Sequence, residues 1–96
     1  MEEGLIFEWD KNKAYLNLTK HSVTFEEART VFNDPLSKIG EDVQHSHNEV
    51  RDIIIGRSIK GRLLIVSYTE RNGKVRIINA RETTKLERLD YEENIK

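Results

Sequence analysis

The sequence predicts an α+β fold in which helices cover one face of an antiparallel β-sheet. Helix-capping signals and helical spacing of apolar residues dominate residues 10–34. Three β-rich runs separated by short turns follow between residues 52 and 80, and helical spacing returns after residue 83. Segregation of helical and strand patterns along a chain is typical of this class, because each element must bury its apolar side against another.

The length and composition favour one domain, residues 1–96. A chain of 96 residues with 36% apolar side chains can bury one core but lacks material for two. It contains no cysteine, so disulfides and cysteine-bound zinc are excluded. No apolar run approaches the roughly 18 residues of a membrane span, and the acidic N-terminus does not resemble a secretion signal. We therefore expect a cytoplasmic protein with no cofactor and no membrane association.

The N-terminal part of the chain predicts a short strand followed by a helical hairpin. Residues 5–9 form the strand, and Asp10 caps a helix that runs through Leu18 and has Lys20-His21 at its end. Thr24 and Glu27 have the spacing of a capping box, which starts a second helix. The buried stripe of this helix is Phe25, Ala28, Val31 and Phe32, and Asn33-Asp34-Pro35 ends it.

The rest of the chain predicts an edge strand, a three-stranded meander and a last helix. Leu36 and Ile39 suit the edge strand, whereas residues 40–42 and 44–48 suit loops. The meander consists of residues 52–57, 63–69 and 75–80, with turns at Lys60-Gly61 and Asn72-Gly73. Residues 83–93 predict a helix whose inward residues are Leu86, Leu89 and Tyr91.

Charge is distributed unevenly along the chain. Residues 1–50 carry 5 Lys/Arg against 10 Asp/Glu, and residues 51–88 carry 10 against 4. Residues 89–96 carry 1 against 3, so the net charge of −1 conceals a segment of +6. A local positive field can bind phosphates even when the total charge is near zero, since salt screens charges beyond roughly 10 Å. The alternative is that strands simply place Lys and Arg on their solvated face.

Two-residue turns would fix the register of the meander by counting. Leu64 then pairs with Arg57 on one side and Arg81 on the other, so both arginines share a face. That face is the expected core side, and it also carries Ile53, Ile55, Val66, Tyr68, Glu70, Val75 and Ile77. The opposite face is expected to be half open, with Ser58, Ser67, Thr69 and Arg76 among Ile54, Ile65 and Ile78. A bulge near Arg81 would move that residue across the sheet.

The polar residues of the chain suffice for RNA cleavage. No phosphate loop, nucleophile elbow or zinc-helix motif is present. The ribose 2′-OH supplies the nucleophile, so the protein needs only a base, cations on the phosphate and an acid for the leaving oxygen. His21 or Glu70 would be the base, and arginines would contact the non-bridging oxygens. Candidate catalytic residues are Lys20, His21, Arg57, Glu70, Arg76 and Arg81, and candidate RNA-binding residues are Arg62, Arg71, Lys74, Lys85 and Arg88.

Several of these groups have structural alternatives. Lys20 and His21 also suit the negative end of a helix dipole. Arg57 and Arg81 could pair with carboxylates such as Glu8 or Asp10. The segment of residues 45–49, His-Ser-His-Asn-Glu, suggests a metal site, but a solvated loop is favoured because a fourth ligand is not evident. Phe7 and Trp9 suit the core or a partner contact better than base stacking.

A series of short motifs resembles the BrnT family of toxins. The first are Phe7-Glu8-Trp9-Asp10, Asn17-Leu18-Thr19-Lys20-His21 and Val23-Thr24-Phe25-Glu26-Glu27-Ala28. They continue with Asp34-Pro35-Leu36, His45-Ser46, Ile55-Gly56-Arg57-Ser58, Gly61-Arg62-Leu63-Leu64, Tyr68-Thr69-Glu70-Arg71, Val75-Arg76-Ile77-Ile78, Ala80-Arg81 and Glu87-Arg88. Each motif alone is weak, but their order and spacing are specific and cover residues 7–91.

The resemblance implies a RelE-like fold and a type II toxin that acts as a metal-independent ribonuclease and suppresses translation. It also implies a BrnA-like antitoxin with a DNA-binding ribbon-helix-helix dimer. The toxin would then form a hetero-oligomer and reach operator DNA only indirectly. The candidate catalytic residues match recurring polar positions of the family. Two positions depart from its pattern: Ser22 stands where glycine is usual, which bears on the aim of His21, and Asn79 stands where serine is usual.

Three functions remain open at the level of sequence. The leading one is the ribonuclease toxin. The second is a binding module without catalysis that acts with its partner in DNA-bound autorepression. The third is a metal-dependent enzyme that uses His21, His45 and His47.

Overall fold

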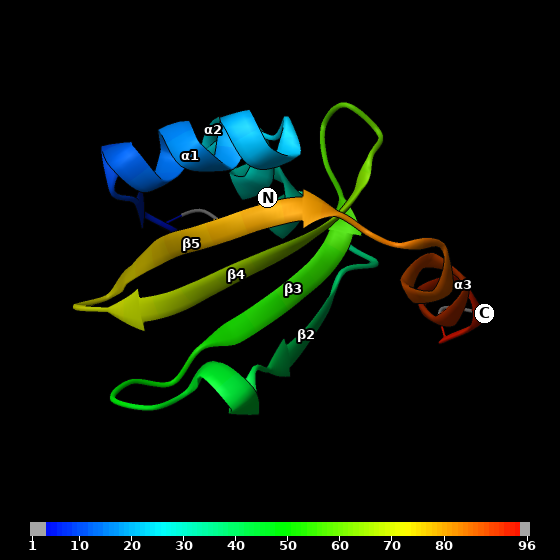
Figure 1. The fold of residues 1–96 in the computed structure, drawn as a ribbon. Helices are drawn as coiled ribbons and strands as arrows, with labels where there is room; N and C mark the ends of the chain where they lie inside the picture. The colour runs from blue at the N-terminus through cyan, green and yellow to red at the C-terminus, as the bar shows by residue number, and fades with distance from the viewer. Residues whose placement is uncertain (1–3, 95–96) are drawn as a thin grey trace.

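Residues 4–94, which the computed structural model describes, form a five-stranded sheet with helices on one face and at one end (Figure 1). The strands are β1 (Phe7–Glu8), β2 (Lys38–Glu41), β3 (Asp52–Arg57), β4 (Leu63–Arg71) and β5 (Lys74–Glu82). The helices are α1 (Lys11–His21), α2 (Phe25–Arg29) and α3 (Lys85–Asn94), with 3-10 turns η1 (Thr30–Asn33) and η2 (Val43–His45). The predicted α+β class is confirmed. No helix in this part of the chain is long and apolar enough to cross a membrane.

The sheet has the strand order β1-β5-β4-β3-β2. Strands β2 to β5 pair antiparallel in chain order. Strand β1 instead pairs in parallel with β5, where Phe7 lies opposite Val75. The prediction of a purely antiparallel sheet is therefore wrong at β1. The edge strand predicted at Leu36 and Ile39 is present as β2. It leaves out Leu36, and it includes Gly40 and Glu41, which were expected in a loop.

The predicted starts of both N-terminal helices are confirmed. Asp10 caps α1 by accepting hydrogen bonds from two first-turn amides at 2.7 and 3.1 Å. Thr24 caps α2 by accepting one from the Glu27 amide at 3.0 Å. The Glu27 carboxylate does not complete the capping box, because it binds Ser58 and Arg62 instead. The first turn of α2 is thus tied to the β3–β4 connection.

The core lies between the helices and one face of the sheet. Its fully buried helical residues are Phe25, Ala28 and Val31, as predicted, and the sheet contributes Ile54, Leu64, Val66, Tyr68, Val75, Ile77 and Ala80. Edge-to-face aromatic pairs join the layers. The centroid of the Phe32 ring lies 5.1 Å from that of Phe7 and 5.0 Å from that of Tyr68. Gly56 allows the chain after α2 to approach β3 closely, because a Cβ there would lie 2.9 Å from Ser37 Cβ.

The predicted register is wrong by one residue on both sides of β4. Leu64 pairs with Gly56 and Glu82, whereas Arg57 pairs with Leu63 and Arg81 with Ile65. The β3–β4 turn is one residue longer than expected, since Ser58 bonds to Arg62 across it and Gly61 has φ +81°. The β4–β5 turn at Asn72-Gly73 has two residues as predicted, but a bulge at Ser67/Tyr68 shifts the register beyond it.

These shifts exchange the predicted faces of β3 and carry Arg81 across the sheet. Ile54 is buried in the core, while Ile53 and Ile55 pair with Ser67 and Ile65 on the opposite face. Arg57 and Arg81 still share a face, as predicted. It is the face turned away from α1 and α2, which we call the open face.

Helix α3 is held by polar contacts more than by apolar packing. Tyr91 is buried as predicted, and its hydroxyl donates to the Leu36 carbonyl at 2.9 Å. Leu86 and Leu89 are 79% and 52% exposed, so the prediction that they face inward is wrong. In Figure 1, α3 lies beyond the end of the sheet and not over its face.

Candidate active site

A cavity of about 320 Å³ lies on the open face. Its floor consists of residues from three adjacent strands that lie side by side in the register: Ile53, Ile65, Ser67, Asn79 and Arg81. The bulge in β5 places Asn79 opposite Ser67 and Arg81 opposite Ile65. A polar pair and a cation are therefore exposed on a floor that is otherwise apolar.

The loop of residues 42–51 forms one wall of this cavity, to which it contributes Asp42, His45 and Arg51. Hydrogen bonds that involve its backbone fasten the loop. The Asp42 amide donates to the Arg51 carbonyl at 2.7 Å, and Ser46 Oγ donates to the Asp42 carbonyl at 2.8 Å. The Arg51 amide donates to Ser46 Oγ at 2.9 Å, and Thr69 Oγ1 donates to the Val50 carbonyl at 2.7 Å. The loop is thus joined at its two ends and anchored to β4.

Asn17 fixes the end of α1 to the other side of the floor. Its buried amide accepts from the Ala80 amide at 3.0 Å and donates to the Ala80 carbonyl at 2.9 Å, as a neighbouring strand would. The same amide donates to the Val23 carbonyl at 2.9 Å. One turn further along α1, Lys20 and His21 line a cavity of about 230 Å³ together with Asn79. Asn79 therefore borders both this cavity and the open-face cavity.

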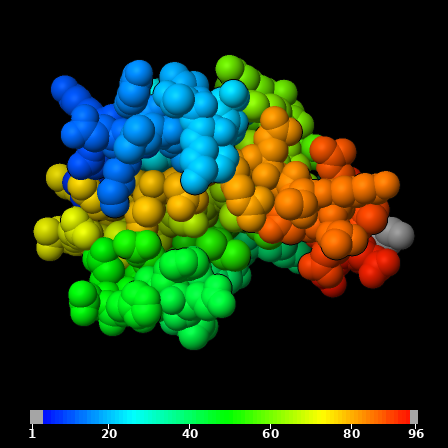
Figure 2. Space-filling model, in the orientation of Figure 1, coloured from blue at the N-terminus to red at the C-terminus, as the bar shows by residue number. Residues whose placement is uncertain are grey.

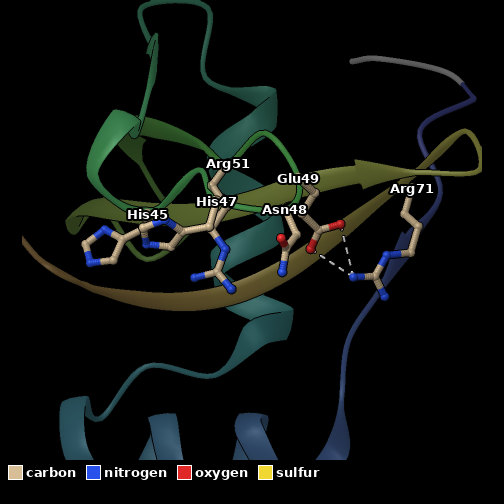
Figure 3. A pocket seen from close by; sticks show the side chains of 6 residues that line it. All are labelled: His45, His47, Asn48, Glu49, Arg51 and Arg71. Carbon is tan, nitrogen blue, oxygen red and sulfur yellow. Dashed lines mark hydrogen bonds and ion pairs between the residues drawn. The ribbon is translucent and has the colours of Figure 1, made fainter.

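A third cavity continues from the 42–51 loop toward the β4–β5 hairpin. It measures about 420 Å³ and is lined by His45, His47, Asn48, Glu49, Arg51 and Arg71. Figure 3 shows these side chains and the pairing of Arg71 with Glu49, at 2.9 Å. It shares His45 and Arg51 with the open-face cavity. In Figure 2, α1 (blue) and the 42–51 loop (green) lie on either side of β5 (yellow to orange).

Arg81 is paired with Glu87 at the start of α3. The guanidinium makes two hydrogen bonds of 2.9 Å to the two carboxylate oxygens. The carboxylate also accepts from the Thr84 amide at 2.7 Å, so Glu87 caps its own helix. The contact with Arg81 is the main cause that lowers the pKa of Glu87 to about 2, and it raises the pKa of Arg81. Both groups stay charged at any ordinary pH.

Asp42 and His45 form a hydrogen-bonded pair on the cavity wall. His45 Nδ1 lies 2.8 Å from Asp42 Oδ2, with side chains 60% and 22% exposed respectively. The carboxylate is the more buried partner, and the imidazole projects from it. Because Nδ1 faces the carboxylate, Nε2 is the ring nitrogen available to a ligand.

The other candidate catalytic residues lie elsewhere. Arg57 is at the far end of β3, 3.6 Å from Glu92 of α3. Arg76 is on the open face but near the β4–β5 hairpin, 3.4 Å from Glu8. Glu70 is exposed beside the same hairpin and lines none of these cavities among the described residues. The structure therefore gathers Lys20, His21 and Arg81, and it separates Arg57, Glu70 and Arg76 from them.

The candidate RNA-binding residues are also dispersed. Arg71 lines the cavity shown in Figure 3. Arg62 points to the helix side, where it binds Glu27, Glu82 and the Ser22 carbonyl. This contact lowers the pKa of Glu27 and raises that of Arg62. Lys74 is exposed at the hairpin, and Lys85 and Arg88 are exposed on α3.

Sequence reasoning missed Asp42, Arg51 and the role of the loop as a wall. The spacing of Asp42 and His45, which is that of one helical turn, was the available signal. Within residues 4–94 no three His, Asp or Glu side chains are grouped to hold a metal ion.

Comparisons with known proteins agree with the motifs in the sequence. The family model described as the ribonuclease toxin BrnT of type II toxin-antitoxin systems matches residues 9–87. The crystal structure of the Brucella abortus ribonuclease toxin BrnT matches with a TM-score of 0.66 at 17% identity, over 84% of this chain and 99% of that one. At this identity the match shows the fold alone. No curated protein matches the chain.

Proposed function

Because the chain belongs to the BrnT family of ribonuclease toxins of type II toxin-antitoxin systems, we propose that it cleaves RNA in the open-face cavity without a metal ion. In this reaction the ribose 2′-OH attacks the adjacent phosphate, which requires a base at the hydroxyl and cations at the phosphate oxygens. The observation that carries the proposal is the placement of Arg81 and Arg51 on the floor and wall of one cavity.

Arg81 is the proposed principal contact of the scissile phosphate. Its hydrogen bonds to Glu82 and Glu87 use three of the five guanidinium N–H groups, and the side chain is 38% exposed. The remaining donors can reach a phosphate from the floor while Glu87 keeps the group in place. A cation held by its own protein before substrate arrives needs little reorganisation when charge develops on the phosphate.

His21 is the proposed base and Lys20 a second cation. Both come from the end of α1, and their cavity meets the open-face cavity at Asn79. Glu70, the other base considered from the sequence, lies at the hairpin end of β4. His21 is therefore the better candidate.

Substitution of Arg81 tests this assignment. We expect Arg81→Ala to lower the rate of RNA cleavage about 10²–10³-fold, the usual loss for one transition-state donor, and to abolish growth arrest in bacteria. Lys20→Ala should also weaken RNA cleavage and growth arrest. The matched control is Arg29→Ala, since Arg29 lies on the helix side over the Phe7 ring and carries the same charge. Undiminished cleavage by Arg81→Ala, or loss of wild-type cleavage in EDTA, would contradict the proposal.

A binding role without catalysis is the second candidate, and the bidentate Arg81–Glu87 pair favours it. An arginine already matched by a carboxylate can serve structure alone. RNA that stays intact during prolonged incubation, together with normal partner binding, would select this alternative.

The family resemblance supports further proposals about the cellular role. The protein suppresses translation in the cytoplasm, and a BrnA-like antitoxin encoded with it neutralises it in a hetero-oligomer that contacts operator DNA only through the antitoxin. The sheet with helices on one face supports a RelE-like assignment of the fold. Co-expression of the neighbouring reading frame should restore growth.

A further inference from the structure

We infer that His45 is the general acid that protonates the leaving oxygen during RNA cleavage, and that Asp42 is its positioning residue. This inference rests on the proposed ribonuclease function. It concerns two residues of the 42–51 loop that the sequence pattern placed in a solvated loop. Three features of that loop carry it.

The first feature is the geometry of the pair. Asp42 Oδ2 lies 2.8 Å from His45 Nδ1, so the carboxylate fixes the orientation of the ring. Nε2 is left as the atom that gives or takes a proton. His45 also borders both the open-face cavity and the cavity shown in Figure 3. A strand of RNA that runs through both would pass the His45 side chain.

The second feature is the hydrogen bonding that holds the loop in place. Ser46, the neighbour of His45, donates to the Asp42 carbonyl at 2.8 Å and accepts from the Arg51 amide at 2.9 Å. Thr69 Oγ1, which is buried, donates to the Val50 carbonyl at 2.7 Å. An exposed histidine on an unsupported loop would sample many positions. Here the backbone on both sides of the pair is fixed to itself and to β4, which is what a catalytic group needs.

The third feature is the placement of His45 relative to His21. Attack at phosphorus and departure of the leaving oxygen take place on opposite sides, so an acid and a base must stand on opposite sides of the phosphate. His21 approaches the floor from α1 across Asn79, and His45 stands on η2 at the other wall. Figure 1 shows α1 and η2 on opposite sides of the central strands. Arg81 lies on the floor of the open-face cavity, whose wall includes His45.

The step is balanced with these groups alone. The bond from the 2′-oxygen to phosphorus forms, and the bond from phosphorus to the 5′-oxygen breaks. The proton of the 2′-OH passes to His21, and the proton on His45 Nε2 passes to the 5′-oxygen. The products are a 2′,3′-cyclic phosphate and a free 5′-OH, and the two histidines return to their starting states through solvent.

An RNA with a sulfur leaving atom tests the assignment. The substrate is an oligonucleotide containing one linkage that the wild-type protein cleaves, prepared with either 5′-oxygen or 5′-sulfur. A thiolate leaves without being protonated, so it removes the need for an acid. We expect His45→Ala to cleave the oxygen substrate about 10²–10⁴-fold more slowly than wild type and the sulfur substrate at the wild-type rate.

Asp42→Asn should lower the cleavage rate of the oxygen substrate less than His45→Ala does, and it should cleave the sulfur substrate at the wild-type rate. Asp42→Glu should lower the rate on the oxygen substrate less than Asp42→Asn does. The matched controls are Glu41→Gln and Gln44→Ala, which change neighbouring exposed residues that line none of the three cavities among the described residues. Both should cleave both substrates at the wild-type rate. Recovery on sulfur also shows that the variant is folded.

Two outcomes would overturn the inference while leaving the proposed function intact. One is unchanged cleavage of the oxygen substrate by His45→Ala when Arg81→Ala is inactive. The other is equal slowing of His45→Ala on both substrates, since that pattern indicates a base or a structural role. If the wild-type protein cleaved neither substrate, the proposed function would fall and this inference with it.

Discussion

Ser22 ends α1 in a left-handed backbone conformation. This conformation costs free energy for any residue that has a side chain. Its φ of 58° and ψ of 33° lie in the left-handed region, and its amide closes the helix by donating to the Leu18 carbonyl at 2.9 Å. The sequence resemblance implies glycine at this position. The serine therefore keeps the helix ending that glycine would give.

Replacement of this serine should stabilise the protein. Ser22→Gly removes the contact between Cβ and the backbone, and we expect the free energy of unfolding to rise by about 0.5–1 kcal/mol. Urea unfolding followed by circular dichroism measures the change. Ser37→Gly is the control, because Ser37 has no left-handed backbone and glycine there should only lower stability. A decrease for Ser22→Gly would show that the left-handed conformation is not strained.

At the scale of elements, α3 depends on three polar contacts near the end of the sheet. Glu87 binds Arg81, Tyr91 donates to the Leu36 carbonyl, and Glu92 lies 3.6 Å from Arg57. Both charged pairs are partly exposed, so each contributes modestly to stability. The helix is thus an element whose attachment responds to the charge state of a carboxylate.

The Arg81–Glu87 pair should make this attachment sensitive to acid. The pKa of Glu87 falls from its ordinary value of 4.5 to about 2 in the folded protein. A lowered carboxyl pKa stabilises the fold fully above pH 4.5, and the stabilisation is lost as pH falls toward 2. Glu87→Gln should therefore be less stable than wild type by about 1 kcal/mol or less at pH 7, and the difference should shrink below pH 4.5.

Urea midpoints at pH 7, 4.5 and 3 measure this difference. Glu93→Gln is the matched control, since Glu93 is an exposed carboxylate of the same helix. It should show no comparable dependence on pH. A stability difference for Glu87→Gln that stays constant down to pH 3 would mean that the pair contributes nothing through the charge of Glu87.

Local sequence signals predicted the elements better than their pairing. The caps at Asp10 and Thr24 were found because capping is decided within a single turn. The register was missed because it depends on one extra residue in the β3–β4 turn and on a bulge at Ser67/Tyr68. A shift of one residue moves every side chain beyond it to the other face. This is why Arg81 was placed on the core side.

The same reasoning explains how much of the site was predictable. Lys20, His21 and Arg81 were candidates because motifs and charge pointed to them, and the structure brings them to adjoining cavities. Asp42 and Arg51 were not candidates, because they reach the open face only through the hydrogen bonds that fold their loop over β4. Contacts between a loop and a distant strand leave no periodic signal in the sequence.

At the scale of the whole molecule, the net charge of −1 is a poor guide to RNA binding. The cations that line the three cavities are Lys13, Lys20, Arg51, Arg71 and Arg81. The carboxylates that line the same cavities are Asp42, Glu49 and Glu87. Cations thus outnumber carboxylates along the proposed RNA path. A single strand that follows this path would displace counterions from its phosphates.

The salt dependence of binding should report this path. We expect the affinity for a non-cleavable 2′-O-methyl RNA to fall with log salt at a slope of about −2, which corresponds to about three phosphate contacts at roughly −0.7 each. Arg71→Ala should reduce the slope by about 0.7 units. Arg29→Ala, on the helix side, should leave it unchanged. Fluorescence anisotropy between low and moderate salt measures both, and an Arg71→Ala slope equal to wild type would place the RNA elsewhere.

The amide of Asn17 has a consequence for solubility. Strand β1 pairs with only two residues of β5, so the rest of that edge would present backbone groups to any passing chain. Asn17 occupies both backbone groups of Ala80 and covers this stretch with α1. At the opposite edge, β2 carries Lys38 and Glu41. The Asn17 side chain thus covers the β5 edge of the sheet, and charged residues line the β2 edge. Both features oppose edge-to-edge aggregation.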